Sequence, residues 1–220
     1  MKNVFLFTVV IAVLAACNSN PKADKATVTD KLEVARADGD LYQISTSSLI
    51  TWQASKPTAT HTGTFTLKEG SLTVKDNQLT GGNFIIDINS LNNLDLASDA
   101  ENKQKLEGHL KSPDFFDVAV YPTAKFEITS VTPISAEETN KALLKDATHT
   151  INGNFTLKDS TKNISFPARV TIDDKTATAS AEFKMDRSQW GLNYKGPNHP
   201  QDWFIRKEVN IKLNISATKK

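Results

Sequence analysis

The 220-residue sequence contains a single cysteine, Cys17, so no disulfide can form within the chain. It also lacks an excess of charge of either sign, because 26 lysines and arginines face 25 aspartates and glutamates, a net charge of +1. Domains that bind nucleic acid carry a basic surface that neutralises phosphates. The balanced composition therefore gives no reason to expect a nucleic-acid partner.

The common signatures of catalysis and metal binding are also missing. The four histidines, His61, His109, His149 and His199, are widely separated, with no pair at helical ligand spacing and no cysteine nearby. A zinc site needs three or four convergent ligands, so no metal is predicted. The sequence has no G-x-S-x-G elbow, P-loop or dinucleotide fingerprint. These absences exclude the commonest nucleophile and phosphate-binding motifs.

The N-terminus has the pattern of an export signal. Lys2 precedes a short apolar run, Val4 to Leu14, which ends in the small-residue sequence LAAC at residues 14–17. LAAC resembles a bacterial lipobox, so we expect a signal peptide over 1–16 and a lipid anchor on Cys17. An ordinary secretory signal and a single N-terminal membrane helix remain open, although the run is shorter than the roughly 20 residues of a span. Asn18 favours the periplasmic face of the outer membrane as the destination.

The segment after the cysteine differs from the rest of the chain. Residues 18 to about 37 are polar, include a proline and show no sustained apolar period. Such composition is typical of a flexible linker, so residues 17–38 are predicted to be a tether. The remaining residues, 39–220, have a length that suits one domain with a sizeable core.

Alternation of apolar and polar residues dominates this domain. The clearest examples are residues 83–89, 151–157, 164–172, 176–185 and 205–215. A period of two gives a strand one apolar face, and short turns between such strands indicate an antiparallel sheet. The sequences at 68–71, 75–78, 158–163 and 173–175 are predicted to be these turns. The apolar face must be covered by a second sheet or by closure into a barrel of about eight strands.

The segment 176–185 bears on whether the interior is hollow. Its apolar face carries Ala177, Ala179 and Ala181 before Phe183 and Met185. Small inward residues leave room for a ligand, but alanines can equally face large residues across a packed core. The sequence leaves both readings open.

Two segments interrupt the strands. Residues 98–112 predict a helix, with Ser98 as N-cap, Glu101 completing a capping box and Pro113 ending it. Residues 186–203 are rich in glycine, proline and aromatics and predict a long loop before the last strand.

The sequence S-P-D-F-F-D at 112–117 follows the predicted helix. Asp114 and Asp117 fit turn chemistry, and Phe115 and Phe116 are interpreted as an apolar plug with at least one ring buried. An acid–base pair between His109 and Asp114 is the alternative.

The segment KLEGHLKSPDFFDVAVYPTAKF, residues 105–126, resembles the most characteristic stretch of the YceI-like family. Further resemblances follow in order: HTGTFTLKEGSLTV from His61 to the family's second and third strands, LTGGNFIIDINSL from Leu79, the hairpin from Ile151 and FKMDRSQWGL from Phe183. Together they cover roughly residues 40–217. KDSTKN at 158–163 departs from the family's usual histidine-glycine turn.

This resemblance implies an all-β fold: an extended antiparallel β-barrel of about eight strands, similar to lipocalins, with a short helix after the fourth strand and a long loop before the last. It implies that the lumen holds an isoprenoid lipid, such as a quinone or polyprenyl chain, without catalysis and without another cofactor. The residues expected to line the lumen are Phe65, Phe84, Ile86, Phe126, Ile128, Phe155, Phe166, Phe183 and Trp190.

Two other functions remain open at this point. One is an enzyme that acts on a lipid or small molecule near His109 and Asp114, which requires both side chains to face the lumen. The other is a filled, ligand-free barrel that serves as a structural or interaction module. The sequence fixes neither the lipid head group nor whether the protein forms a homodimer.

Overall fold

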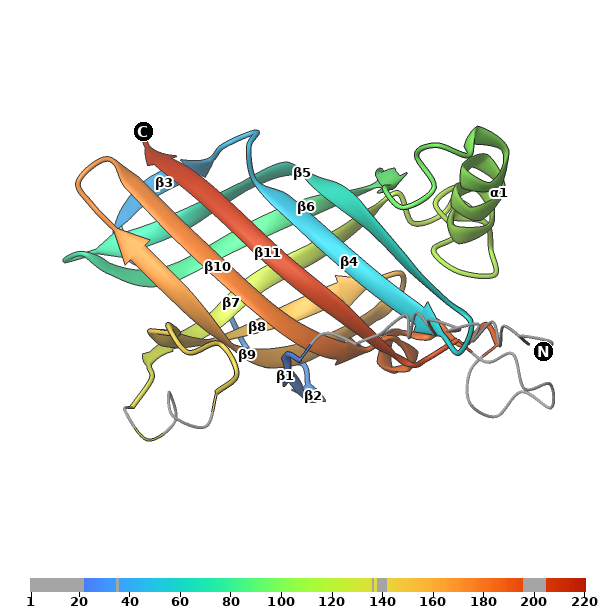
Figure 1. Cartoon of the computed structure of the whole chain (residues 1–220). Coiled ribbons are helices and arrows are strands. Elements are labelled where there is room, and N and C mark those ends of the chain that lie inside the picture. Colours follow the sequence, from blue (N-terminus) through green and yellow to red (C-terminus); the bar gives the residue numbers. More distant parts are fainter. Residues whose placement is uncertain (1–21, 35, 136, 138–141, 196–204) are drawn as a thin grey trace, which may run out of the picture.

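The computed structural model describes residues 22–34, 36–135, 137, 142–195 and 205–220 (Figure 1). The predicted signal peptide at 1–16, the predicted lipid anchor at Cys17 and residues 196–203 of the predicted long loop lie outside the described residues.

The described residues form eleven strand segments, one α-helix and one 3-10 helix. The strands are β1 (Asp24–Lys25), β2 (Thr27–Asp30), β3 (Asp40–Ile44), β4 (Leu49–Lys56), β5 (Ala59–Lys75), β6 (Gln78–Asn93), β7 (Thr123–Pro133), β8 (His149–Leu157), β9 (Ser160–Ile172), β10 (Thr176–Asp186) and β11 (Glu208–Lys219). The helices are α1 (Ala100–Lys111) and η1 (Arg187–Trp190).

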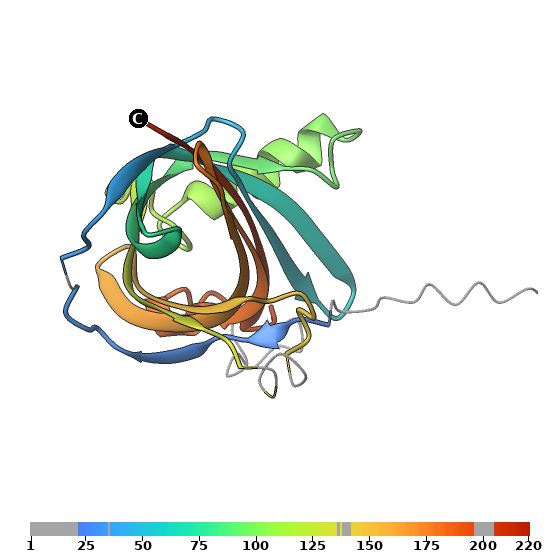
Figure 2. The same ribbon diagram turned by 90° about the vertical axis from the view of Figure 1, so that its left-hand side faces the viewer.

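The sheet closes on itself to form an antiparallel barrel. β3 and β4 occupy one position in the wall, since both pair with β5 on one side and with β11 on the other. With β5 to β11, they make eight positions, and β9–β10 pairing completes the circle. Figure 2 looks along the barrel and shows the wall curling round to meet itself. The predicted all-β, eight-stranded fold is confirmed, with α1 after β6, the fourth strand counted from β3.

β5 runs as one 17-residue strand, although residues 68–71 were predicted to be a turn. Its register against β6 shifts between Leu67 and Glu69, where an irregularity takes the place of a chain reversal. A bulge of this kind bends a strand without ending it, which lets β5 follow the curve of the barrel. The reversal comes at Asp76 and Asn77, whose φ angles of 51° and 60° suit a tight hairpin.

The seam between β9 and β10 is filled in part by the N-terminal strands. Direct pairing of β9 with β10 covers only residues 169–172 and 177–180. Farther along, β1 pairs with β10 in parallel and β2 pairs with β9 in antiparallel fashion. Residues 24–30, within the predicted tether, are therefore part of the barrel wall, and Val28 packs against the core.

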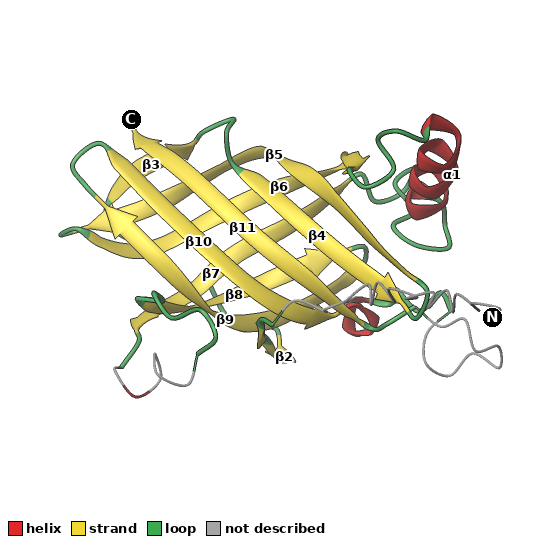
Figure 3. Cartoon of the chain, in the orientation of Figure 1, coloured by secondary structure: helices red, strands yellow, loops and turns green. Residues whose placement is uncertain are grey.

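The N-cap of α1 lies one residue later than predicted. Asp99, rather than Ser98, is the N-cap, because its carboxylate accepts the backbone N–H of Asn102 at 3.1 Å. The helix ends at Lys111, before Pro113, and none of its residues is fully buried. Figure 3 shows α1 and η1 at the same end of the barrel. Among the described residues, no helix has the length and apolar character needed to cross a membrane.

Candidate functional site: an apolar cavity in the barrel

The interior of the barrel is hollow. A cavity of about 420 Å³ is lined by inward-facing residues of β4 to β11 and by the segments around α1 and η1. This volume lies in the range of roughly 300–1,000 Å³ that is typical of small-molecule sites. Ala179 and Ala181 line it beside Phe183 and Met185, so the small residues of β10 do leave room.

Eight of the nine residues expected to line the lumen lie on the cavity wall. They are Phe65, Phe84, Ile86, Phe126, Ile128, Phe155, Phe166 and Phe183. Trp190 does not line it. Its side chain is fully buried behind the wall, where Nε1 donates to the backbone oxygen of Phe155 at 2.9 Å and the two rings pack 5.4 Å apart. Trp190 therefore holds η1 against the barrel.

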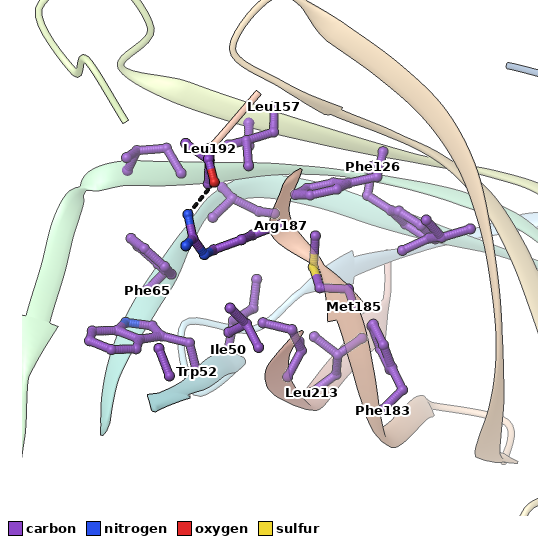
Figure 4. Close-up of a pocket in the computed structure, with 18 of the residues that line it drawn as sticks. Ile50, Trp52, Phe65, Phe126, Leu157, Phe183, Met185, Arg187, Leu192 and Leu213 are labelled. Carbon is purple, nitrogen blue, oxygen red and sulfur yellow. Dashed lines mark hydrogen bonds between the residues drawn. The ribbon is translucent and has the colours of Figure 1, made fainter. Parts of the chain in front are cut away.

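Aromatic rings continue from strand to strand around the wall. Phe84 stacks on Phe126 at 6.2 Å, Phe126 lies 6.1 Å from Phe166, and Phe166 stacks on Phe183 at 4.2 Å. Figure 4 shows Phe126 and Phe183 on one side of the cavity and Trp52 and Phe65 on the other. Gly153 makes room for the Phe126 ring, since a Cβ there would lie 2.2 Å from it.

One end of the barrel is sealed by packing. Ala177 and Ala217 are fully buried there and do not reach the cavity. Tyr42 closes the same end, with its hydroxyl donating to the backbone oxygen of Asp173 at 3.2 Å. This contact joins β3 to the turn between β9 and β10. We call this part of the molecule the sealed end.

The opposite end, beside α1 and η1, is where the cavity reaches solvent. The polar lining residues Lys56, Lys195, His61 and His109 are all partly exposed at this end. The side chains of His61 and His109 are 28% and 37% exposed. We call this end the mouth.

Phe115 and Phe116 cover part of the mouth from the inside. Both line the cavity, and Phe116 makes an edge contact of 5.6 Å with Phe65. The chain then turns at Asp117, whose φ of 50° is left-handed and whose carbonyl accepts from Tyr121 N–H at 2.8 Å. The interpretation of S-P-D-F-F-D as a turn carrying an apolar plug is confirmed.

His109 and Asp114 are close together but do not share the cavity. His109 Nε2 lies 3.0 Å from Asp114 Oδ2, and only the histidine lines the lumen. The His109 ring packs edge-on at 4.6 Å against Tyr194, across the mouth. In the described part of the chain, no group of three histidine, cysteine, aspartate or glutamate side chains could hold a metal ion.

Arg187 ties together the two sides of the long loop that follows η1. Its guanidinium donates to the backbone oxygens of Leu192 and Tyr194 on one side and of Ile205 and Arg206 on the other. The bond to Leu192 is drawn in Figure 4. Burial lowers the pKa of this guanidinium below its ordinary value, although Asp186 opposes the shift. Arg187 is a positioning residue that fixes the rim of the mouth.

The lining residues of β4 and of the loop beyond η1 were not predicted from the sequence. Ile50, Trp52, Ala54 and Lys56 alternate along β4 and all line the cavity. The same period of two was present in this segment and marks Ile50, Trp52 and Ala54, although not the charged Lys56. Tyr194 had no such signal, because its place depends on the loop held by Arg187.

A comparison with family models decides the classification. The YceI-like domain model matches residues 42–217, most of the chain. The chain belongs to the YceI-like family. A search of curated proteins finds no match.

Solved structures of low sequence identity share the fold. BcnA of Burkholderia cenocepacia is 18% identical, with a TM-score of 0.60 over 78% of this chain and 96% of that one. A polyisoprenoid-binding domain from Saccharophagus degradans, implicated in plant cell wall breakdown, is 15% identical, with a TM-score of 0.57 over 83% of this chain and all of that domain. A YceI protein of Campylobacter jejuni is 16% identical, with a TM-score of 0.50 over 100% of this chain and 99% of that protein.

Proposed function

We propose that this YceI-like barrel binds a long-chain isoprenoid lipid, of the quinone or polyprenyl type, in its lumen and carries or sequesters it without chemical change. The observation that carries the proposal is the cavity of about 420 Å³, walled by aromatic and aliphatic side chains and open at one end. Burying the hydrocarbon in such a wall is favourable by about 25 cal/mol per Å² of apolar surface.

Two further observations support a binding role. A structural neighbour from the same fold is described as a polyisoprenoid-binding domain. The ionisable residues nearest to a catalytic arrangement, His109 and Asp114, do not both face the cavity. A ligand that needs only apolar burial and a few polar contacts at the mouth suits this wall better than a substrate that must be activated.

The location of the protein is part of the same proposal. An export signal over residues 1–16 and acylation of Cys17 would hold the barrel on a membrane, at the periplasmic face of the outer membrane. A carrier anchored there would exchange its lipid with the bilayer. Labelling with a radioactive fatty acid in a bacterial host tests this part, with Cys17→Ala as the control that removes the label.

Extraction of the purified protein tests the central claim. The barrel is purified from its native host, washed, and extracted with organic solvent, and the extract is analysed by mass spectrometry. We expect an isoprenoid in near-stoichiometric amount. An empty protein that also fails to take up added geranylgeraniol would overturn the proposal. A chemically altered lipid, lost with His109→Ala while binding persists, would instead indicate an enzyme.

A further inference from the structure

The barrel wall has a gap along one seam, between β9 and β10. The two strands pair directly only over residues 169–172 and 177–180. Continuing this register toward the mouth would place Phe166 opposite Phe183, and these two rings do stack at 4.2 Å in the lining of the lumen. The backbones no longer pair there. Past this point each strand has an edge that is open to another partner.

Residues 24–32 fill this gap, and we call them the strap. β1 adds in parallel to β10 at Phe183 and Lys184, and β2 adds in antiparallel fashion to residues 162–165 of β9. Ala26, between the two, donates its N–H to the Lys184 oxygen at 2.9 Å. Figure 2 shows this segment, in blue, along the outside of the wall. The strap therefore joins two edges that do not pair with each other.

A polar side chain fastens each end of the strap. At one end, the Asp24 carboxylate accepts the backbone N–H groups of Leu143 and Leu144 at 2.9 and 3.2 Å. At the other, the Asn154 amide accepts from the Leu32 N–H at 3.0 Å and donates to the Leu32 oxygen at 2.7 Å. Asn154 does not line the cavity, and it is fully buried because Leu32 lies on it. The outer surface of the barrel thus has a built site for the strap.

Little apolar surface holds the strap in this site. Of its side chains, only Ala26 and Val28 pack against the core, and both are partly buried. Leu32 is 50% exposed, and Lys25, which pairs with Glu208 at 2.6 Å, is 69% exposed. Segments with few buried apolar contacts open at a lower free energy than the rest of a fold. This favours release of the strap while the wall itself stays folded.

The gap that the strap covers leads into the lumen. Ile164 and Phe166 of β9 line the cavity along one edge, and Phe183 and Met185 of β10 line it along the other. Phe183 and the end of β10 at Asp186 are about 10 Å apart along the strand. Withdrawal of the strap would therefore leave a side opening of about this length beside the mouth.

We propose that the strap closes a lateral gate in the barrel wall, and that the bound lipid passes between the lumen and a bilayer through this gate. Asp24 follows Cys17 by seven residues, and seven extended residues reach at most about 25 Å. An acyl anchor on Cys17 would keep the gate within that distance of the membrane. The inference rests on the proposed function, because it concerns how the same lipid enters and leaves.

A disulfide that locks the strap tests the gate. Thr27 and Ser165 lie opposite each other on the outer side of β2 and β9, so Thr27→Cys with Ser165→Cys gives the lock. Thr171→Cys with Thr178→Cys is the matched control, since it joins β9 to β10 where the two strands already pair. Both pairs are introduced together with Cys17→Ser, which leaves no other cysteine in the chain.

The readout is the transfer of tritiated geranylgeraniol from the loaded protein to phosphatidylcholine vesicles. We expect the oxidised lock to slow transfer about tenfold or more, because the lipid leaves only after the strap has opened. Dithiothreitol should restore the rate, and the control disulfide should change it by less than about twofold. The amount of lipid bound should be the same in all of these proteins, because none of the four introduced cysteines lines the cavity.

Loosening the strap should have the opposite effect. Asp24→Ala removes the acceptor of two backbone N–H groups and should speed transfer about threefold or more. Asp30→Ala is the matched control on the same strap, since the Asp30 side chain is fully exposed and lies 3.7 Å from Lys162. Its transfer rate should stay within about twofold of the native rate.

Hydrogen exchange in the native state provides a readout that needs no lipid. The amides of Ala26 and Leu32 should exchange about tenfold or more faster than those of residues 177–180, which belong to the paired part of the seam. Asp24→Ala should speed the strap amides further and leave residues 177–180 unchanged.

Two results would overturn the gate. They are a transfer rate that the oxidised lock leaves unchanged, and strap amides that exchange no faster than those of residues 177–180. In either case the barrel still binds geranylgeraniol, so the proposed function survives. A protein that takes up no geranylgeraniol would refute both.

Discussion

The two ends of the barrel are built from the same strands but differ in how they are held together. At the sealed end, the interior is filled by small side chains such as Ala177 and Ala217, and Tyr42 bridges the opening. At the mouth, α1 has no fully buried residue, and charged side chains reach the cavity. Side-chain packing closes the sealed end, whereas hydrogen bonds from side chains to backbone oxygens hold the rim of the mouth.

This difference indicates how a hollow protein stays folded. A cavity forfeits the packing that a filled core would supply, so stability must come from the wall and the sealed end. The mouth can then be held by a small number of polar contacts, among them the four hydrogen bonds that the Arg187 guanidinium donates to backbone oxygens. Changes at the mouth, in the lumen and at the sealed end should therefore have separable effects.

Removal of Arg187 should have the largest effect. Arg187→Ala leaves up to four backbone oxygens without their donor in a buried region, and we expect a loss of about 3 kcal/mol or more in the free energy of unfolding. Arg187→Lys should be intermediate, because an ammonium has three donors in place of a planar fork. Urea unfolding measures both.

The matched control for this change is Arg169→Ala. Arg169 forms an exposed ion pair with Asp146 at 3.0 Å on the outer wall, so its loss should stay within about 0.5 kcal/mol. A loss at Arg187 no greater than this would show that the contacts at the mouth do not stabilise the fold.

A bulky residue in the lumen should affect binding more than folding. Ala179→Phe places a ring in the cavity, and displacing about 60 Å² of ligand contact would cost ~1.5 kcal/mol, roughly tenfold in the affinity for geranylgeraniol. The melting temperature should fall little, since the ring occupies existing space. Thr178→Phe, exposed on the outer face of the same strand, is the control. Equal affinities of the two variants would mean that the lipid does not fill this part of the lumen.

Much of this architecture could be predicted from the sequence, because it depends on period-two alternation. The segments 83–89 and 151–157 lie within β6 and β8, and the inward phenylalanines of these strands do line the cavity. Alternation is a property of neighbouring residues in the sequence, so it can be recognised without knowledge of the fold. The wrong turn at 68–71 has the same origin, since a glycine beside charged residues looks alike in a hairpin and in a bulge.

Features that join distant segments could not be predicted in this way. Trp190 has the large aromatic side chain expected of a lining residue, but its hydrogen bond to Phe155, 35 residues away, holds it behind the wall. Residues 24–30 look like a linker and gain their strand structure only because β9 and β10 leave edges for them to pair with.

The turn at the sealed end should give the smallest effect, and one that depends on pH. Asp173 accepts from the Thr176 hydroxyl at 2.7 Å and from the backbone N–H groups of Lys175 and Thr176, and these bonds hold the pKa of its carboxyl below the ordinary value despite partial desolvation. A depressed folded-state pKa contributes stability at pH values above the unfolded pKa of about 3.9, and this contribution is lost as the pH falls through the folded pKa. The difference in unfolding free energy between the native protein and Asp173→Asn should thus be constant from pH 5 to 7 and shrink below about pH 4. Lipid affinity should be the same in both proteins throughout, because Asp173 does not line the cavity. A difference that stays constant down to pH 3 would mean that ionisation of this carboxyl does not help to close the sealed end.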